Sequence, residues 1–487
     1  MTAANRKHFL KEFPKALNDG NGAVFVGAGV SMAAGYPSWA KLLREIGQEL
    51  GVDSTDVQDL TALAQWSIQD NDASRVQNVI LNEISPNKDI PPVVRILARL
   101  PLRHIWTTNY DRLIERAFEE IKRPLHAISK GQELARRLPM PGAARLYKMH
   151  GCVTAPSEVV ISTDHYERYG RERGQFLPLF QAHLTGMSML FIGLSFTDPN
   201  IKHVLSLIRD SFTDAPPEHF AIVRPPHRDD FRSAKEHKAR LTQHTLWAKD
   251  LRRYGLRVVE VDTYDEIPEL MEQIERRLSA RRIWVSGSWP VDSDSADSSN
   301  IYKFSEKLGK AIAENQRDLV TGAGLLVGSA SLQGFVAALR HGAEWDINQR
   351  LTARPFPQPI KGQPPKREEW TKLRQELARL AGVIIFVGGL KMKDGELVLA
   401  DGMLEELEFA RQQGAFLLPI GATKGVAEEI YKRLKGSDIP VKGKKVQRPT
   451  DAELDSLANH ELLLGEDNHE TLLKRVFKII DRVYSDD

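Results

Sequence analysis

The sequence contains a single cysteine, Cys152, among 487 residues. One thiol cannot form a disulfide within the chain, and it cannot supply the several cysteines of a structural zinc site. A nucleophilic pair with His150 is also disfavoured, because residues so close along an extended strand are poorly placed for proton transfer. We therefore expect Cys152 to be buried and unreactive, and we expect no zinc or other metal site.

Net charge and long apolar runs are lacking as well. The 67 basic and 65 acidic residues leave a formal charge of only +2, which favours neither a nucleic-acid nor a membrane partner. The most apolar runs, at 190–192 and 383–387, are far shorter than the roughly 20 residues of a membrane-spanning helix. The first twenty residues lack the apolar centre of a signal peptide. These absences predict a cytoplasmic protein without nucleic-acid or membrane contacts.

What the sequence does contain is an alternation of strand-like apolar runs with helical periodicity. Apolar runs that end in Gly, Asn, Asp or His recur through the first half, and a second series starts at Ile283. At 487 residues the chain exceeds one ordinary domain. We predict an α/β fold with two parallel-sheet domains, at residues 1–282 and 283–487.

One strand-like run, Val24-Phe25-Val26, ends in Gly27-Ala28-Gly29, and a helical pattern follows from Ser31. Such a turn presents main-chain amides and the positive end of a helix dipole, which suit a phosphate. The dinucleotide-binding pattern G-x-G-x-x-G is incomplete, because Met32 occupies its last position. A glycine turn that only allows close packing of the main chain remains the alternative interpretation.

Two further predicted strands end in polar residues. The run 104–108 leads into Asn109-Tyr110-Asp111, and the run 144–149 leads into His150. The carboxyl ends of parallel strands meet at one edge of a sheet, so these residues and the Gly27 turn are expected to lie together. A neutral imidazole can accept a proton or bind a ribose hydroxyl, and an asparagine can orient a water. Helix capping and a purely structural histidine remain the alternatives.

Four motifs, in order along the chain, resemble those of the sirtuin (SIR2) family, and they are Gly27-Ala28-Gly29-Val30-Ser31, Thr108-Asn109-Tyr110-Asp111, Lys148-Met149-His150-Gly151 and Gly193-Leu194-Ser195. The resemblance implies that the first domain binds NAD and breaks its bond to nicotinamide. Sirtuin deacylases carry a four-cysteine zinc module, whereas this chain has only Cys152. The resemblance therefore implies a SIR2-type NAD hydrolase, in which water takes the place of the acyl oxygen.

The same resemblance implies which residues bind NAD, namely Gly27, Ala28, Gly29, Ser31, Thr108, Asp111, Gly193, Ser195 and Asn200. Among them, the Gly27 turn would hold the pyrophosphate, and Asp111 would position the nicotinamide end. Ser195 and Asn200 would contact the adenosine side.

Two residues are implied to be catalytic, Asn109 and His150. Asn109 would hold the attacking water or the ribose, and His150 would act as general base or as an anchor for the ribose. The transition state is expected to resemble an oxocarbenium ion, so the site would mainly support developing positive charge and exclude misplaced water.

The second half resembles SLOG domains, which are Rossmann-like sensors of nucleotide signals. The resemblance rests on Val285-Ser286-Gly287-Ser288, Thr321-Gly322-Ala323-Gly324 and Arg354-Pro355-Phe356-Pro357. Positions similar to the signal-binding ones of these domains are Ser286, Gly287, Arg374, Lys391 and Glu406. Arginine and lysine suit phosphates and glutamate suits ribose hydroxyls, with ordinary helix-surface charge as the alternative. Both domains are therefore expected to be Rossmann-like, SIR2-type and then SLOG-type.

This domain order is similar to that of effectors of the bacterial Thoeris anti-phage system. The resemblance implies that a partner protein with a TIR domain makes a cyclic ADP-ribose isomer on infection. The SLOG-type domain would bind this isomer, and the SIR2-type domain would then deplete NAD. Such a gate suggests a homotetramer or higher assembly, with no cofactor beyond the substrate NAD. An NAD-dependent deacylase and a non-catalytic nucleotide-binding sensor remain as alternative functions.

Overall fold

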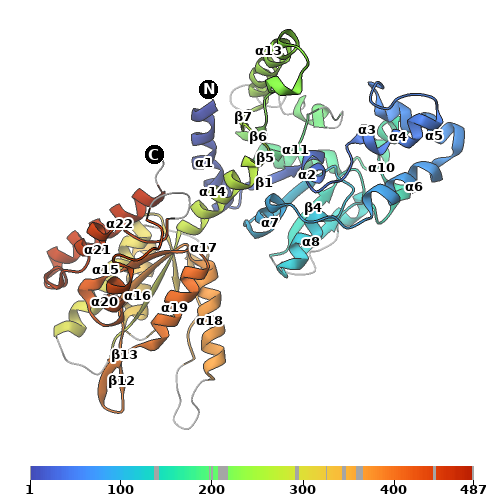
Figure 1. Cartoon of the computed structure of the whole chain (residues 1–487). Helices are drawn as coiled ribbons and strands as arrows, with labels where there is room; N and C mark the ends of the chain where they lie inside the picture. Colours follow the sequence, from blue (N-terminus) through green and yellow to red (C-terminus); the bar gives the residue numbers. More distant parts are fainter. Residues whose placement is uncertain are drawn as a thin grey trace. The chain divides into compact units, whose positions relative to one another are not determined.

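A computed structural model describes residues 2–135, 142–196, 198, 201–206, 218–290, 296–324, 326–342, 347–357, 366–441 and 446–484. The chain divides into two compact units, Met1–Glu275 and Arg276–Asp487 (Figure 1). We call them the first and second units.

The division falls inside one helix, α14 (Glu266–Ala280), a few residues before the boundary expected after residue 282. Glu275 of this helix forms an ion pair with Arg99 of the first unit. The carbonyl of Ser279, one turn further on, accepts a hydrogen bond from the amide of Gly382 in the second unit. The two ends of the helix therefore belong to different units, which a composition shift along the sequence could not reveal.

The first unit is built on a seven-stranded parallel sheet, in the order β3-β4-β2-β1-β5-β6-β7. Its strands are β1 (Gly22–Val26), β2 (His104–Thr107), β3 (Leu125–Ile128), β4 (Ala144–Lys148), β5 (Ser188–Ile192), β6 (His219–Val223) and β7 (Leu256–Glu260). All five residues of β1 are buried, as expected for a central strand covered on both faces.

The helices of the first unit are α1 (Thr2–Asn18), α2 (Ala28–Ala33), α3 (Trp39–Leu42), α4 (Arg44–Glu49), α5 (Leu60–Asn71), α6 (Ala73–Ile84), α7 (Pro92–Arg99), α8 (Leu113–Glu120), α9 (Thr163–Glu167), α10 (Tyr169–Glu172), α11 (Phe176–Gly186), α13 (Ala234–Asp250) and the first part of α14. Helix α1 packs on β1, β5 and β7. The ring of Phe180 in α11 contacts Phe25 of β1 and Trp106 of β2, and these three side chains are fully buried.

The second unit has a five-stranded parallel sheet in the order β10-β9-β8-β11-β14, with a separate antiparallel hairpin, β12-β13. The strands are β8 (Arg282–Ser288), β9 (Asp318–Thr321), β10 (Leu351–Ala353), β11 (Val383–Gly388), β12 (Leu390–Lys393), β13 (Glu396–Leu399) and β14 (Phe416–Pro419). The helices are α15 (Ala296–Glu314), α16 (Val327–His341), α17 (Ile347–Arg350), α18 (Arg367–Leu380), α19 (Asp401–Gln412), α20 (Gly425–Leu434), α21 (Asp451–Ser456) and α22 (Glu466–Tyr484).

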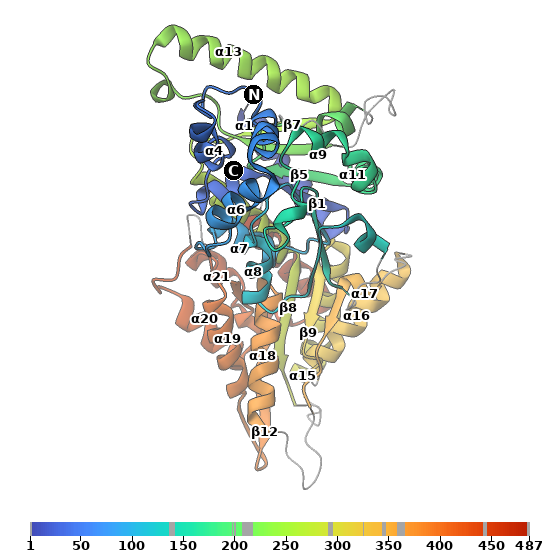
Figure 2. The ribbon, with the colours of Figure 1, turned by 90° about the vertical axis from the view of Figure 1, so that its right-hand side faces the viewer.

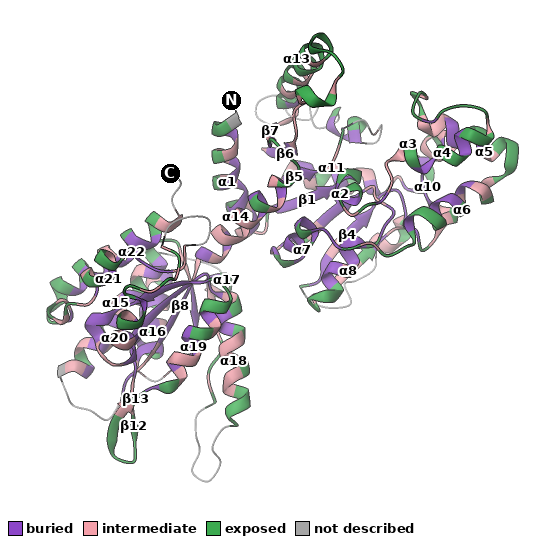
Figure 3. Cartoon of the chain, viewed as in Figure 1, coloured by how far each residue is buried: buried purple, intermediate pink, exposed green. Residues whose placement is uncertain are grey.

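Alternate strand residues of this second sheet feed two separate cores. Ile283 and Val285 of β8 pack with α15, α16 and α22, whereas Trp284 packs with α18, α19 and α20. Figure 2 shows α16 on one side of β8 and β9, with α18 and α19 on the other. The central strands of both sheets, such as β1 and β11, are buried, in contrast to α13, in which no residue is buried (Figure 3). The division into two cores arises because successive side chains along a strand point to opposite faces of the sheet.

The predicted fold class, two parallel-sheet α/β domains, is confirmed. The helix after the Gly27 turn was predicted wrongly, since it begins at Ala28 rather than at Ser31 and ends at Ala33. Gly27 has an extended backbone and acts as the N-cap, so the helix starts directly after the strand. No helix within the described ranges is both long enough and apolar enough to cross a membrane.

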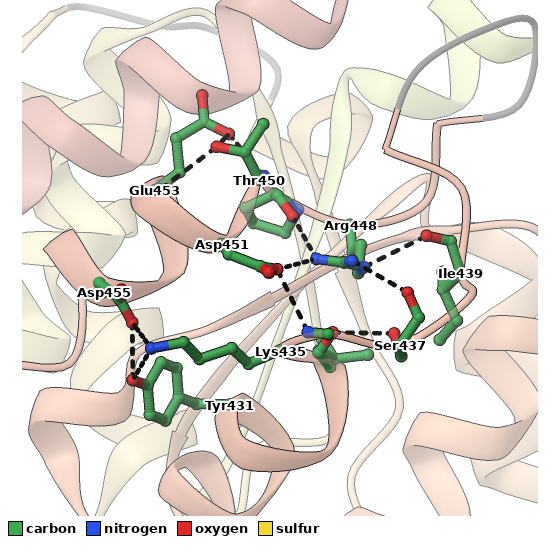
Figure 4. A network of polar contacts seen from close by, with 12 residues as sticks. Tyr431, Lys435, Ser437, Ile439, Arg448, Thr450, Asp451, Glu453 and Asp455 are labelled. Atoms are coloured by element: carbon green, nitrogen blue, oxygen red, sulfur yellow. Dashed lines mark hydrogen bonds and ion pairs between the residues drawn. The ribbon is translucent and has the colours of Figure 1, made fainter.

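A polar cluster around Arg448 holds the loop between α20 and α21 (Figure 4). Arg448 is buried and donates to the carbonyl oxygens of Ser437 at 3.0 Å and Ile439 at 3.2 Å, and to the carboxylate of Asp451 at 2.6 Å. Because most of these acceptors are main-chain carbonyls of the loop itself, the guanidinium fastens the loop to the first turn of α21. We interpret the cluster as structural.

Candidate functional site

Four strands of the first sheet bring the predicted site residues to one edge. β1 lies between β2 and β5. The chain forms β2, β3 and β4 on one side of β1 and then β5, β6 and β7 on the other, so the strand order reverses at β1. The Gly27 turn follows β1, Asn109 follows β2, His150 follows β4 and Gly193 follows β5. In open parallel sheets, ligands bind beyond the carboxyl ends of the strands at such a reversal.

The Gly27 turn packs directly against the turn after β5. The amide of Gly27 donates to the carbonyl of Ile192 at 2.8 Å, and the amide of Gly29 donates to that of Gly193 at 2.9 Å. A Cβ on Gly27 would overlap the Gly193 carbonyl, and one on Gly193, where φ is +68°, would lie 2.8 Å from the amide nitrogen of Val30. Glycine is therefore required here for close main-chain approach.

Ser31, Asn109 and Asp111 form a connected hydrogen-bond network. The Ser31 hydroxyl donates to Asp111 Oδ2 at 2.5 Å, and Asn109 Nδ2 donates to Ser31 Oγ at 2.8 Å and to the Gly27 carbonyl at 2.9 Å. The second carboxylate oxygen of Asp111 accepts from the amide of Leu113 at 3.0 Å, at the start of α8. The sequence had suggested that these residues meet but not how they bond.

This network determines which way the Asn109 amide faces. The Ser31 hydroxyl hydrogen is committed to the Asp111 carboxylate, so Ser31 Oγ can only accept from its other neighbour. The Asn109 NH₂ group must therefore point at Ser31 and at the Gly27 carbonyl, a second acceptor. Asn109 Oδ1 accepts no hydrogen bond from any described residue. It is a buried acceptor of fixed orientation in the turn after β2.

A buried ion pair lies behind this network. Lys148, the last residue of β4, has 1% of its surface exposed and donates to Glu115 Oε1 at 2.9 Å and to the carbonyl of Asp111. Burial disfavours its ammonium, but the Glu115 carboxylate holds the pKa of Lys148 above its ordinary value. A cavity of about 10 Å³ lies between these groups and Asn109, too small for any part of a dinucleotide.

His150 is buried, with its Nε2 at 3.4 Å from Asp198 Oδ2. Burial lowers the pKa of His150, although the Asp198 carboxylate opposes the shift. The Tyr166 hydroxyl donates to the same Asp198 oxygen at 3.0 Å, and its ring stands edge-on to the imidazole. At neutral pH the imidazole is therefore uncharged and able to accept a proton.

The other predicted NAD-binding residues line the same edge. Ala28, Gly29 and Ser195 are exposed there, and Thr108 and Gly193 are half-buried. Asn200 lies outside the residues that the structure describes.

In the second unit the structure brings together three of the five predicted signal-binding residues. Ser286, on β8, donates to Glu406 Oε2 at 2.5 Å, and Arg374 Nε, on α18, lies 3.3 Å from Glu406 Oε1. Burial raises the pKa of Glu406, opposed by the Ser286 hydrogen bond and the Arg374 charge. Arg374 also forms a 2.6 Å ion pair with Glu405, the preceding residue of α19.

The other two predicted signal-binding residues lie differently. Gly287 follows Ser286 on β8, and a Cβ there would lie 2.5 Å from Val327 Cγ1 and from the Val387 carbonyl, so it is needed for packing. Lys391 is on β12 and pairs with Asp401 rather than with Ser286, Arg374 or Glu406.

Several partners in these networks were not predicted as site residues, among them Lys148, Glu115 and Glu405. Lys148 left a signal, because it lies in one of the four motifs and interrupts the apolar stretch 146–149, where a buried charge is unusual. Glu115 and Glu405 are ordinary helix carboxylates in the sequence, and only the fold shows their partners. No group of three or more His, Cys, Asp or Glu side chains arranged to hold a metal ion occurs among the described residues.

Two family models match the chain in the predicted order. A SIR2-like domain matches residues 103–246, and the Sir2- and TIR-associating SLOG family matches residues 266–483. The chain is also similar to a protein from Bacillus subtilis named defense-associated sirtuin 2, at 26% identity over 227 residues, 45% of this chain and 22% of that protein.

Two relatives align over nearly their full length. NAD(+) hydrolase ThsA of Bacillus cereus (strain MSX-D12) is 34% identical over 428 residues, which cover 88% of this chain and 89% of the relative. NAD(+) hydrolase ThsA of Enterococcus faecium is 33% identical over 440 residues, covering 88% of this chain and 91% of the relative. With this identity over most of both chains, and with the two domains in the same order, the chain belongs to the ThsA family of NAD(+) hydrolases.

Proposed function

We propose that this protein hydrolyses NAD⁺ at the bond between nicotinamide and ribose, in the cytoplasm, as part of anti-phage defence. The names of the relatives, NAD(+) hydrolase and defense-associated sirtuin, support the reaction and the setting. The observation that carries the proposal is the Asn109 amide, which Ser31 and Gly27 fix so that its buried oxygen is left as an unpaired acceptor, in the turn after β2 at the carboxyl edge of the sheet.

NAD binds across the reversal of strand order, with its pyrophosphate on the Gly27 turn. This assignment is supported by the place of the Gly27 turn, directly after β1 where the strand order reverses, and by the exposure of Ala28 and Gly29. Ser195 and Asn200 contact the adenosine side. Asp111 acts on the nicotinamide end through Ser31 and Asn109, because both of its carboxylate oxygens are already hydrogen-bonded.

In the reaction, the oxygen of a water molecule bonds to the anomeric carbon of the ribose as the carbon–nitrogen bond breaks. Nicotinamide leaves with the electron pair of that bond, and the water gives up a proton. Asn109 Oδ1 accepts a hydrogen bond from the water or from a ribose hydroxyl, which orients it. The uncharged His150 takes the proton or anchors the ribose. No cofactor or metal takes part.

The second unit controls the first. A cyclic ADP-ribose isomer, made by a partner protein with a TIR domain, binds at Ser286, Gly287, Arg374, Lys391 and Glu406, and its binding activates a homotetramer or higher assembly. The family name, which couples SLOG to Sir2 and TIR, supports such a link. Light scattering of the purified protein should give a mass of at least four times the 54.8 kDa chain.

One experiment separates this proposal from its two alternatives. The full chain is incubated with NAD⁺ alone, with each of several cyclic ADP-ribose isomers, or with an acylated peptide, and the products are separated by chromatography. We expect nicotinamide and ADP-ribose in the presence of one isomer. Nicotinamide formed only with the peptide would indicate a deacylase, and binding of NAD⁺ without products would indicate a non-catalytic sensor.

A further inference from the structure

A fully buried lysine is rare, and Lys148 is buried at the carboxyl edge of the sheet. Its charge is balanced by Glu115 on α8, one oxygen of which it binds at 2.9 Å. Removing two charges from water costs about as much as their attraction returns, so a buried pair of this kind adds little stability compared with apolar side chains of similar size. Stability alone therefore gives no reason for a lysine at this position.

The second hydrogen bond of Lys148 gives such a reason. Its ammonium donates to the main-chain carbonyl of Asp111. The carboxylate of the same Asp111 accepts from Ser31, and Ser31 accepts from Asn109. Lys148 thus lies at the inner end of a chain of hydrogen bonds whose outer end is the oriented amide of Asn109.

The packing behind the site makes this chain sensitive to the ion pair. A cavity of about 10 Å³ is lined by Lys148, Glu115, Asp111, Ser31 and Asn109 together. The turn 109–111 therefore has room to move inward. A hydrogen bond from a rigid, buried donor opposes that movement, because Lys148 is fixed at the end of β4.

We propose that Lys148, neutralised by Glu115, is a positioning residue for the cleavage of NAD⁺: it fixes the Asp111 carbonyl, and through Asp111 and Ser31 it keeps the Asn109 amide in its working orientation. This inference rests on the proposed function. It assigns no contact with NAD⁺ to either residue of the pair. Its signature is a loss of turnover while NAD⁺ binding and the fold are preserved.

The test removes both charges at once, in the double variant Lys148→Met/Glu115→Gln. The two replacements have similar volumes and leave no unpaired buried charge, so the fold should survive. The matched control is Lys130→Met/Glu158→Gln, which removes the exposed ion pair of the same unit. We expect kcat to fall about ten- to a hundred-fold in the buried double variant, with KM for NAD⁺ changed less than about three-fold. The control pair should leave both unchanged.

A double-mutant cycle shows whether the effect passes through Ser31. If it does, the Lys148→Met/Glu115→Gln change should lower kcat little further in a Ser31→Ala background. Independent, multiplying losses of kcat would overturn the inference, and so would an unchanged kcat in the folded double variant. An inactive wild-type protein, tested with each cyclic ADP-ribose isomer, would instead overturn the proposed function.

Glu115→Gln alone gives an independent second measurement, made on protein whose fold is checked by circular dichroism. Lys148 then keeps an acceptor but loses its main counter-charge, with Asp111, Cys152 and Tyr36 as the remaining titratable groups around it. The pKa of Lys148 should then fall. In the pH profile of kcat, the decrease on the alkaline side should therefore begin at a lower pH than in the wild type, while KM stays constant. A decrease of kcat that begins at the same alkaline pH as in the wild type would contradict a positioning role for the charged lysine.

Discussion

Asn109 has a donor end and an acceptor end, and its neighbours in the first unit occupy only the donor end. An asparagine free to rotate would present its amide nitrogen and oxygen to a ligand about equally. The commitment of the Ser31 hydroxyl to Asp111 removes this freedom. At the scale of single residues, the orientation of the Asn109 amide therefore depends on the direction of one serine hydroxyl.

Replacement of Ser31 by alanine tests this dependence. Asp111 loses one hydrogen bond and the Asn109 amide loses the partner that orients it, so we expect stability to fall by about 1 kcal/mol and kcat by about ten-fold. Ser67→Ala is the matched control, because the Ser67 hydroxyl is also buried but has no hydrogen-bond partner among the described residues. Steady-state kinetics and denaturant unfolding of both variants measure the difference. Equal kcat values for the two would contradict the role of Ser31.

The residue types of the site were predictable from the sequence, but their bonding was not. Polar residues directly after apolar strands had to gather at one edge once the sheet was parallel, which placed Asn109 and His150. Which hydroxyl donates to which carboxylate depends on side-chain packing, and Lys148 pairs with a residue 33 positions away. Such partners follow from the fold and leave no pattern in the local sequence.

Among the structural elements, two turns behave as one. The Gly27 turn after β1 and the Gly193 turn after β5 are joined by two main-chain hydrogen bonds and lie within van der Waals contact. Gly27 has an extended backbone and Gly193 a left-handed one, and no side chain separates the two turns. In the proposed function, a pyrophosphate resting on one turn would therefore also contact the other.

The variant Gly27→Ala should separate the two turns. The new Cβ would collide with the Gly193 carbonyl, so we expect a loss of stability of about 1–3 kcal/mol and at least about ten-fold weaker NAD⁺ binding by calorimetry. Gly186→Ala, at the end of α11, is the control, since nothing lies within 4 Å of its added Cβ. Wild-type NAD⁺ affinity in the Gly27 variant would show that the turn does not bind the pyrophosphate.

Two histidines link β2 to α11. His183 accepts a hydrogen bond from Trp106 Nε1 at 3.0 Å, and its ring centre lies 4.3 Å from that of His104. Burial lowers the pKa of each histidine to about 4, with the positive charge of neighbouring groups as a further cause. Both rings are therefore uncharged in the folded protein well below the pH at which they become charged in the unfolded chain.

The lowered pKa values of these two histidines determine how the stability of the fold depends on pH. Between an ordinary histidine pKa of about 6.5 and the folded value of about 4, the unfolded chain binds protons that the folded chain does not, so stability falls as the pH falls. His183→Gln keeps an acceptor for Trp106 but does not titrate. Denaturant unfolding at about pH 7 and about pH 5 should show a smaller loss of stability for this variant than for the wild type. The exposed His203→Gln should retain the wild-type loss, and identical slopes for all three proteins would contradict the prediction.

Strands β5 and β11 were predictable because each contains at least four apolar residues in a row, which is typical of a strand buried on both faces of a parallel sheet. The elements that were missed lack that signal. β3 is a half-buried edge strand, β12 and β13 form a largely exposed hairpin, and α13 buries none of its residues. Their structure depends on neighbours rather than on an apolar pattern.

At the scale of the whole molecule, the proposed function requires the second unit to respond to a bound ligand. Arg374 is the only cation bonded to both Glu405 and Glu406 among the described residues, and it lies over the rings of Phe356 and Trp370. A phosphate-bearing ligand would compete with these carboxylates for the guanidinium. In the structure, the Glu405 and Glu406 carboxylates therefore occupy the guanidinium to which such a phosphate would bind.

Removal of the Arg374 charge should abolish sensing. We expect Arg374→Met to lose binding of the activating cyclic ADP-ribose isomer by at least about ten-fold in calorimetry, since its phosphates lose a charged donor. Arg379→Met is the control, because Arg379 is exposed on the same helix, α18. Wild-type affinity in the Arg374 variant would place the signal elsewhere.

The central claim is that one unit destroys NAD⁺ only when the other has bound its signal. The most direct measurement is the rate of nicotinamide release by the full chain and by Asn109→Ala, each with and without the cyclic ADP-ribose isomers. We predict rapid release by the wild type with one isomer, little release without it, and none by Asn109→Ala under either condition. Release by the wild type at the same rate with and without every isomer, or release by Asn109→Ala at the wild-type rate, would contradict the account.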